Sequence, residues 1–269
     1  TMATPEFTVP EALKFFSELK LDGAEVVIQS DFISGIPLEA SDAQVKEVRR
    51  LADDLALPIA ATTPYLNLYN SLDEAVRQRE QDGLMRVIDM SAILGAASIR
   101  IYGGAFKDDE TDPDGRKLAQ LVKTLRACGD YAQSAGIVLS VENHFGTMAT
   151  TVAKTMRVIR AIDHPAVGIL YDQANLAFLP AEEYKEAIST QIGHINYVHV
   201  KDLVYRGGSP KPFRSDSVSH ISEDIRTVFS RIPGDGILDW PAILQYLKDS
   251  GYDGWLSLEY ERRWGKQDL

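Results

Sequence analysis

The chain has 269 residues, 45% of them hydrophobic, which is enough for one large domain or two small ones with a sizeable core. The net charge of −11 disfavours a duplex-DNA-binding protein, because such proteins usually present a basic face. No apolar run reaches the roughly 18 residues of a membrane span, and the first residues lack a basic and apolar signal region. The single cysteine, Cys128, fits a reducing compartment, so we expect a cytoplasmic protein without membrane or nucleic-acid partners.

Strand-like apolar runs alternate with amphipathic helical segments from one end of the chain to the other. Two helix starts are marked by capping boxes, in which Thr8 precedes Glu11 and Ser41 precedes Gln44. Along the chain we expect helices from 9 and 42, over 71–94, around 118–128 and over 152–162, 181–188 and 239–250. We expect strands over 24–28, 57–62, 97–102, 136–142, 166–172, 195–202 and 254–259.

Four of the expected strands run directly into a polar side chain that suits a metal ion. These residues are Glu142, Asp172, His199 and Glu259. Because the carboxyl ends of parallel strands meet at one side of a sheet, four such endings predict one shared site. Three carboxylates and an imidazole suit a divalent cation such as Mn, Mg, Co or Zn. The competing interpretation is a set of scattered structural salt bridges.

Strands that alternate with helices predict βαβ units and a parallel sheet. We predict an α/β fold, a (β/α)8 TIM barrel, as a single domain over residues 1–269. Only seven strands are expected, so we interpret Thr1 to Thr4 as the tail of a first strand that is truncated or lies largely upstream of Thr1. An open doubly wound sheet is the alternative. It is disfavoured because no glycine-rich phosphate loop follows any strand and the four candidate ligands come from four different strands.

The sequence resembles the sugar phosphate isomerase/epimerase superfamily, the xylose-isomerase-like TIM barrels. The resemblance rests on V-E-N-H at 141–144, Y-D at 171–172, V-H-V-K-D at 198–202, G-D-G-I-L-D-W-P at 234–241 and the closing strand at 251–259. It implies one divalent metal ion held by Glu142, Asp172, His199 and Glu259. It also implies that Glu142 and Glu259 are an acid/base pair that abstracts a proton next to a carbonyl, giving an enediolate that the metal stabilises. We therefore expect an isomerase or epimerase acting on a sugar or keto-sugar, and a homo-oligomer.

Three further residues are candidate substrate contacts. His144 lies two residues beyond Glu142, and Lys201 lies two beyond His199, so each shares a strand face with a candidate ligand. His144 could instead support a ligand, and Lys201 could instead form a salt bridge with Glu142 or Glu259. Several ketose epimerases of the superfamily carry a histidine where this chain has Asn175, and an amide does not titrate near neutral pH.

The Asn175 difference and a long segment over 203–238, after the seventh strand, support an alternative. It is a lyase or dehydratase acting on a keto-inositol or a 3-keto-glycoside with the same metal site. The long segment is either a functional lid or a surface insertion. A zinc phosphodiesterase of the abasic-site endonuclease type is less favoured, because it needs histidine ligands where the earlier strands end in Tyr65 and Tyr102. A barrel that binds sugars without turnover is the last possibility.

Overall fold

Helices and strands alternate in the computed structural model, which describes residues 1–107, 109–177, 182–208 and 228–260. The helices are α1 (Val9–Glu18), α2 (Asp42–Asp54), α3 (Glu74–Leu94), α4 (Arg116–Ser134), α5 (Val152–Ile162), α6 (Gln173–Leu176), α7 (Tyr184–Gln191) and α8 (Trp240–Asp249), with short 3-10 turns η1 (Ile192–His194) and η2 (Arg206–Gly208). The strands are β1 (Ala24–Ile28), β2 (Gly35–Ile36), β3 (Ile59–Pro64), β4 (Ser98–Ile101), β5 (Val138–Glu142), β6 (Val167–Asp172), β7 (Ile195–Val200), β8 (Asp202–Tyr205), β9 (Val228–Arg231) and β10 (Leu256–Leu258).

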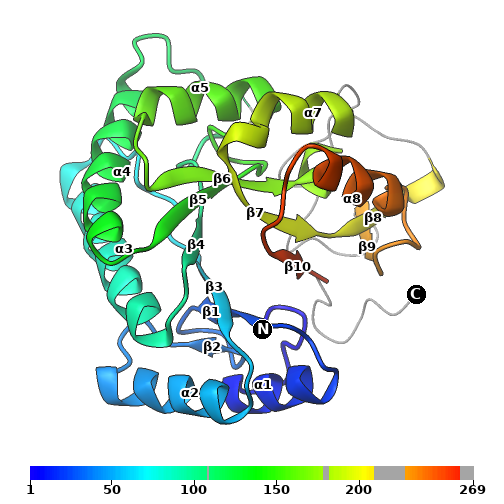
Figure 1. Ribbon diagram of the computed structural model, residues 1–269. Coiled ribbons are helices and arrows are strands. Elements are labelled where there is room, and N and C mark those ends of the chain that lie inside the picture. The colour runs from blue at the N-terminus through cyan, green and yellow to red at the C-terminus, as the bar shows by residue number, and fades with distance from the viewer. Residues whose placement is uncertain (108, 178–181, 209–227, 261–269) are drawn as a thin grey trace.

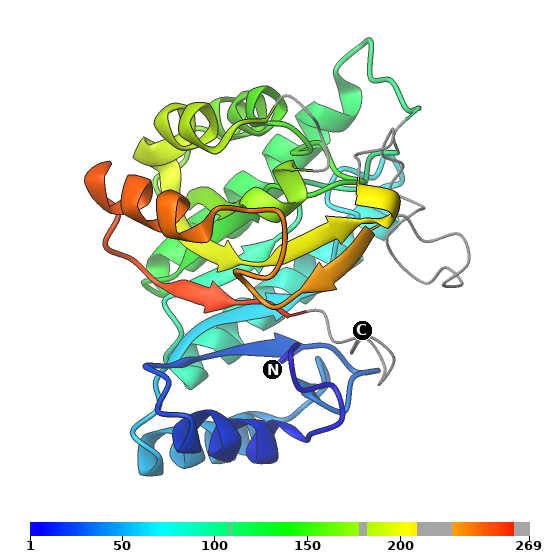
Figure 2. The same cartoon turned by 90° about the vertical axis from the view of Figure 1, so that its right-hand side faces the viewer.

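Eight strands form one parallel sheet in the order β10-β7-β6-β5-β4-β3-β1-β2. The sheet curls, with the larger helices on its outer side (Figure 1; Figure 2). The predicted TIM-barrel fold is confirmed, and all seven expected strands are present. The eighth strand is β2, a two-residue strand that the sequence did not reveal.

No strand is assigned over residues 1–4, of which residues 2 and 3 form a turn, so a first strand that is truncated or lies largely upstream of Thr1 stays a prediction. Thr1 nevertheless lies against β1, where its amino group donates to the Glu25 carbonyl and its hydroxyl accepts from the Val27 amide at 3.1 Å. Among the described residues, β10 pairs with β7 alone, so β10 and β2 are the two edges of the sheet.

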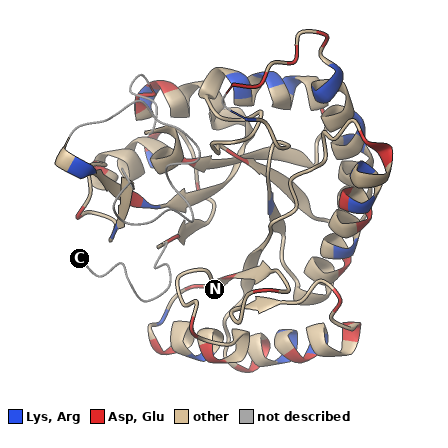
Figure 3. Ribbon diagram, turned by 180° about the vertical axis from the view of Figure 1, so that it is seen from behind, with Lys and Arg blue, Asp and Glu red and all other residues tan. Residues whose placement is uncertain are grey.

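The two faces of the sheet carry different side chains. On β4 and β5 the outward residues, such as Ile99 and Leu139, pack into the main core together with the helices. The inward residues are polar: Ser98 and Ser140 share a hydrogen bond of 2.9 Å, and Arg100 contacts Glu142 one layer further on. Many charged residues lie along the outer helices (Figure 3). Polar groups are therefore concentrated inside the curled sheet, where a site can form.

Both capping boxes are confirmed: the Thr8 amide donates to the Glu11 carboxylate at 2.8 Å, and the Ser41 amide donates to Gln44 at 2.9 Å. Several boundaries differ from prediction by a few residues, and two of the differences have a clear local cause. β3 begins at Ile59 because Pro58 has no amide to donate to a ladder. α3 begins after Asp73, whose carboxylate accepts from the Ala75 amide at 2.9 Å.

The segment predicted as a long loop over 203–238 contains secondary structure of its own. β8 and β9 pair antiparallel within it, while residues 209–227 lie outside the described residues. Asp202 anchors residues 234–238, since its carboxylate accepts from the amides of Gly234 at 3.0 Å, Gly236 at 3.1 Å and Leu238 at 3.2 Å. A lid function for this segment stays a prediction. Within the described residues, no helix is long and apolar enough to cross a membrane.

Candidate metal centre

The register of the sheet brings the four predicted ligands together. Asp172 on β6 is the direct register partner of His199 on β7, and Ser257 on β10 is the partner of His199 on its other side. Glu259 lies two residues beyond Ser257 and Glu142 pairs with Leu170, two residues before Asp172. Because side chains alternate along a strand, all four ligand candidates point to the same face of the sheet.

One ligand atom from each of Glu142, Asp172, His199 and Glu259 lies within 4.8 Å of all the others. Glu142 and Asp172 are fully buried, His199 is 2% exposed, and the Glu259 side chain is 11% exposed. His199 Nδ1 lies 2.9 Å from Glu259 Oε2 and 3.5 Å from Glu142 Oε1. The sequence prediction that these residues share one site agrees with this geometry, while their role as ligands stays a proposal.

Two atoms of the cluster have the property expected of metal ligands. His199 Nδ1 and Glu259 Oε2 are buried, face each other, and make no hydrogen bond with any described residue. Their contact is an ion pair only while His199 is protonated, and a buried polar atom without a hydrogen bond costs about 1–3 kcal/mol, a cost that a bound cation would remove. Three carboxylates and one imidazole also match the ligand preferences of Mn²⁺, Mg²⁺ and Zn²⁺. The residues present therefore fit a divalent ion.

Arg100 on β4 is a buried cation that the sequence analysis did not single out. Its Nε lies 2.6 Å from Glu142 Oε2, and both side chains are less than 5% exposed. Its guanidinium also stacks on Tyr102, 3.8 Å from the ring centre, and lies 5.4 Å from the ring of Tyr65. Burial alone would raise the pKa of Glu142, but the charge of Arg100 holds it well below the usual value. Arg100 thus fixes Glu142 as an ionised carboxylate.

Lys201 and Asn175 connect the carboxylates of the cluster. The Asn175 amide donates to Asp172 Oδ2 at 2.9 Å and to Glu142 Oε1 at 3.2 Å, and Lys201 Nζ donates to Asn175 Oδ1 at 3.3 Å. Lys201 Nζ also lies 3.8 Å from both Asp172 and Glu259. The predicted salt bridge from Lys201 to Glu259 is therefore present. The predicted contact of Lys201 with substrate stays a proposal.

The carboxylates of the cluster are not equivalent in their acidity. Burial raises the pKa of Asp172 to about 7, although Lys201 opposes the shift. Burial would also raise the pKa of Glu259, but Lys201 and His199 lower it to about 2. A metal ion that binds here must therefore displace a proton from Asp172 near neutral pH.

His144 lies beside the cluster. Its ring packs edge-on against Tyr102, with ring centres 4.8 Å apart, and its Nδ1 lies 2.6 Å from the Phe145 carbonyl. Burial and the neighbouring Arg100 lower the pKa of His144 to about 4, against the opposing charge of Glu142. His144 is therefore neutral at physiological pH, and its predicted contact with substrate stays a proposal.

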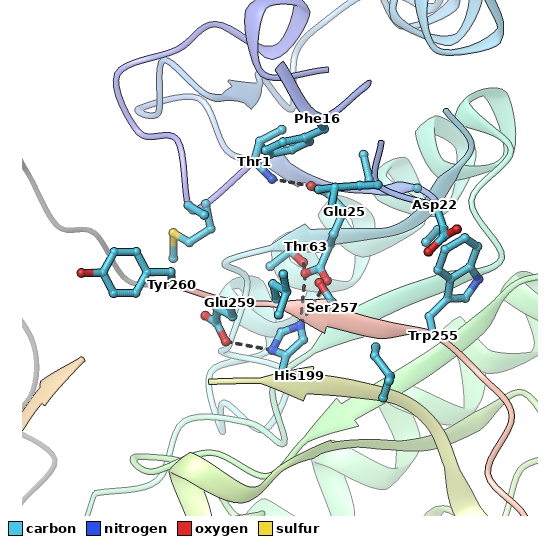
Figure 4. Close-up of a pocket in the computed structure, with 18 of the residues that line it drawn as sticks. Thr1, Phe16, Asp22, Glu25, Thr63, His199, Trp255, Ser257, Glu259 and Tyr260 are labelled. Atoms are coloured by element: carbon cyan, nitrogen blue, oxygen red, sulfur yellow. Dashed lines mark hydrogen bonds and ion pairs between the residues drawn. The ribbon is translucent and has the colours of Figure 1, made fainter. Parts of the chain in front are cut away.

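Glu25 on β1 is a second residue that the sequence analysis did not single out. It contacts His199 on the side of the ring that faces away from the other three candidate ligands. Its Oε2 lies 3.1 Å from His199 Nε2 (Figure 4). Glu25 and His199 also line a cavity of about 870 Å³ between β1 and β10, together with Thr63 and Glu259. The signal that could have revealed Glu25 and Arg100 is the same in both cases, a single charged residue inside an otherwise apolar strand.

The comparisons with known proteins agree with this architecture. The model of the xylose isomerase-like TIM barrel family matches residues 13–269. The chain belongs to that family. An inosose dehydratase from Geobacillus thermodenitrificans is 30% identical over 142 residues, which cover 53% of this chain and 46% of that protein. Similar relatives from Lacticaseibacillus casei and Clostridium perfringens carry the same name. The chain thus aligns with about half the length of these curated relatives.

Two solved structures support the fold. The probable 3-DHS dehydratase AsbF from Bacillus anthracis superposes with a TM-score of 0.77 at 16% identity, over 98% of this chain and 92% of that chain. The 3-keto-D-glucoside 4-epimerase YcjR from E. coli superposes with a TM-score of 0.73 at 18% identity, over 97% and 89% of the two chains. At these identities the superpositions show the shared barrel fold. The dehydratases and the epimerase are proteins that this chain resembles, and the chain itself belongs to the xylose isomerase-like TIM barrel family.

Proposed function

We propose that this protein is a divalent-metal-dependent lyase that removes water from a keto-polyol of the keto-inositol class. The alternative reaction weighed from the sequence therefore replaces the isomerase or epimerase as the main hypothesis. The observation that carries the change is the name inosose dehydratase, which several relatives by sequence share, combined with a buried cluster of three carboxylates and one imidazole. The presence of Asn175 in place of a histidine supports the same choice.

The residues of the site have separate tasks in this reaction. Glu142, Asp172, His199 and Glu259 would hold the ion, which when bound polarises the substrate carbonyl and makes the adjacent C–H more acidic. Glu259 takes the proton at the α-carbon, because Arg100 and Asn175 engage the two carboxylate oxygens of Glu142. This assignment differs from the predicted acid/base pair, since it leaves Glu142 as a fixed ligand.

The elimination balances without an external reactant. The electron pair of the broken C–H bond forms the new carbon–carbon double bond, and the bond to the β-hydroxyl breaks. The proton held by Glu259 leaves with that hydroxyl as water. Lys201, placed 3.8 Å from Glu259 and from Asp172, supplies a positive charge beside the oxygen atoms on which negative charge develops.

Incubation of the Mn-loaded protein with a keto-inositol in D₂O tests the proposal. The expected product is the substrate minus one water, detected by mass spectrometry. Protein treated with a chelator should not form this product. An epimerase is the second candidate, favoured by the same α-proton chemistry. It would give a product of unchanged heavy-atom composition with deuterium at the α-carbon, and that result would overturn the lyase assignment.

A cytoplasmic location, a homo-oligomer and the absence of nucleic-acid partners stay predictions.

A further inference from the structure

The two ring nitrogens of His199 face different partners. Nδ1 points to the ligand cluster, 2.9 Å from Glu259 Oε2. Nε2 points the opposite way, 3.1 Å from Glu25 Oε2 and 3.3 Å from Glu25 Oε1. The ring is therefore held between Glu259 of the ligand cluster and the Glu25 carboxylate on β1, as Figure 4 shows.

Glu25 is itself firmly held in this position. It lies on β1, its side chain is 14% exposed, and it accepts a hydrogen bond from the Thr63 hydroxyl on β3. Burial would raise the pKa of Glu25, but the charge of His199 and hydrogen bonds from His199, Thr63 and Ser257 lower it. A carboxylate with several donors and little exposure has few alternative rotamers, so it presents its oxygens to His199 in a fixed direction.

We propose that Glu25 is a positioning residue for the metal site. By accepting a hydrogen bond from Nε2–H, it selects the tautomer of His199 that carries its proton on Nε2. The lone pair of Nδ1 is then directed to the position bounded by Glu142, Asp172 and Glu259. This inference rests on the metal site of the proposed function and adds a residue from β1, a strand that supplies none of the four ligands.

A merely structural role for Glu25 predicts a different behaviour. An ion pair that only stabilises the fold would be indifferent to which nitrogen of His199 carries the proton, and its loss would lower stability without altering metal affinity. A positioning role predicts that metal affinity and the tautomer of His199 change together. Carboxylate partners of metal-bound histidines typically change affinity about 10–100-fold when they are removed.

The test uses Zn²⁺ alone as the probe, with competition against a chelator at about pH 8, where proton competition for the ligands is reduced. The variants are Glu25→Ala, Glu25→Gln and Thr63→Val. The matched control is Glu39→Gln, which removes an exposed carboxylate that is held by Ser30 at 2.7 Å. Histidine ¹⁵N resonances of the Zn-loaded proteins report which nitrogen of His199 is protonated. Near-UV circular dichroism shows whether each variant is folded, and Glu25→Gln keeps the shape of the side chain should Glu25→Ala unfold.

Glu25→Ala is expected to bind Zn²⁺ about 10–100-fold more weakly than the wild type and to lose the protected Nε2–H signal of His199. Glu25→Gln and Thr63→Val should give smaller losses, and Glu39→Gln should stay within about twofold of the wild type. Wild-type affinity together with an unchanged His199 tautomer in folded Glu25 variants would overturn the positioning role. If the wild type binds no divalent metal, both this inference and the metal-dependent function are overturned. If the wild type binds metal but leaves keto-inositols unchanged, only the proposed reaction is contradicted.

Discussion

Replacement of Arg100 by methionine should destabilise the metal-free protein strongly. The substitution keeps an apolar stem of similar length and removes the guanidinium that lies 2.6 Å from Glu142. Glu142 then stays buried as a carboxylate without its principal counter-charge. Removal of one partner from a buried ion pair costs about 3–5 kcal/mol, and the lost stacking on Tyr102 adds to that cost.

The assay is urea unfolding in the presence of a chelator, followed by circular dichroism. With a urea dependence of at least about 2–3 kcal/mol per molar, the midpoint should fall by about 1–2 M. Adding Glu142→Gln to Arg100→Met should restore much of the loss, because the uncompensated charge is removed together with its partner. Saturating Mn²⁺ should also reduce the loss, because the metal supplies positive charge to Glu142.

The pH dependence of the loss follows from the pKa of Glu142. In the wild type that pKa lies well below 4.5, so the stabilisation from the pair is present above about pH 4.5 and disappears as the pH falls through the folded-state pKa. The difference between wild type and Arg100→Met should therefore shrink on acidification. The control is Asp53→Asn, which breaks an exposed pair with Arg49 and should cost less than about 1 kcal/mol. If Arg100→Met loses no more stability than this control, the buried ion pair is not what fixes Glu142.

Three further predictions concern the ligand cluster and the contacts of Asp202 with residues 234–238. Glu259→Gln should abolish water elimination in a protein that near-UV circular dichroism shows to be folded, and near-wild-type turnover would remove Glu259 from the mechanism. Affinity for Mn²⁺, measured by titration from pH 5 to 8, should rise by at least about tenfold per pH unit below pH 7, because Asp172 must lose its proton and Glu25 and Glu259 also raise the pKa of His199 against the effect of burial; a flat profile would contradict the raised pKa values of these ligands. Asp202→Ala should lower the free energy of unfolding by about 2–4 kcal/mol, because it removes the acceptor of the amides of residues 234–238. A loss below about 1 kcal/mol in urea unfolding would show that these hydrogen bonds do not stabilise residues 234–238.

The ligand set could be predicted because the position of a strand end is encoded locally. Glu142, Asp172, His199 and Glu259 each follow an apolar run, and any parallel sheet that closes on itself brings such endings to one side. Capping boxes such as Thr8 with Glu11 were predictable for the same reason, since their partners lie three residues apart. These features depend on neighbouring residues and on one general property of parallel sheets.

The supporting residues could not be assigned because their partners are distant in sequence. Arg100 is separated from Glu142 by 42 residues and Glu25 from His199 by 174, so only the register of the sheet decides that they meet. Their strands look apolar with one charged residue, a pattern that fits a salt bridge, a substrate contact or an edge position equally well. The role of Asp202 was likewise hidden, because it holds backbone amides of residues 234–238, whose side chains give no sign of the contact.

The eighth strand illustrates a different limit. β2 consists of Gly35 and Ile36, and two residues carry no hydrophobic periodicity. Their pairing with β1 is set by the turn between them, in which the Gly35 amide donates to the Phe32 carbonyl at 3.0 Å. The strand count inferred from apolar runs therefore gave seven, and β2 is the strand of the sheet that it missed.

The central claim is that one divalent ion occupies the cluster at the ends of β5, β6, β7 and β10. The most direct test is the metal content per chain, by elemental analysis of protein purified without a chelator, reloaded with Mn²⁺ and freed of excess metal. The account predicts about one ion per chain in the wild type and almost none in Asp172→Ala, with Glu39→Gln unchanged. The absence of metal under every loading condition, or the same content in Asp172→Ala as in the wild type, would contradict the four-ligand site.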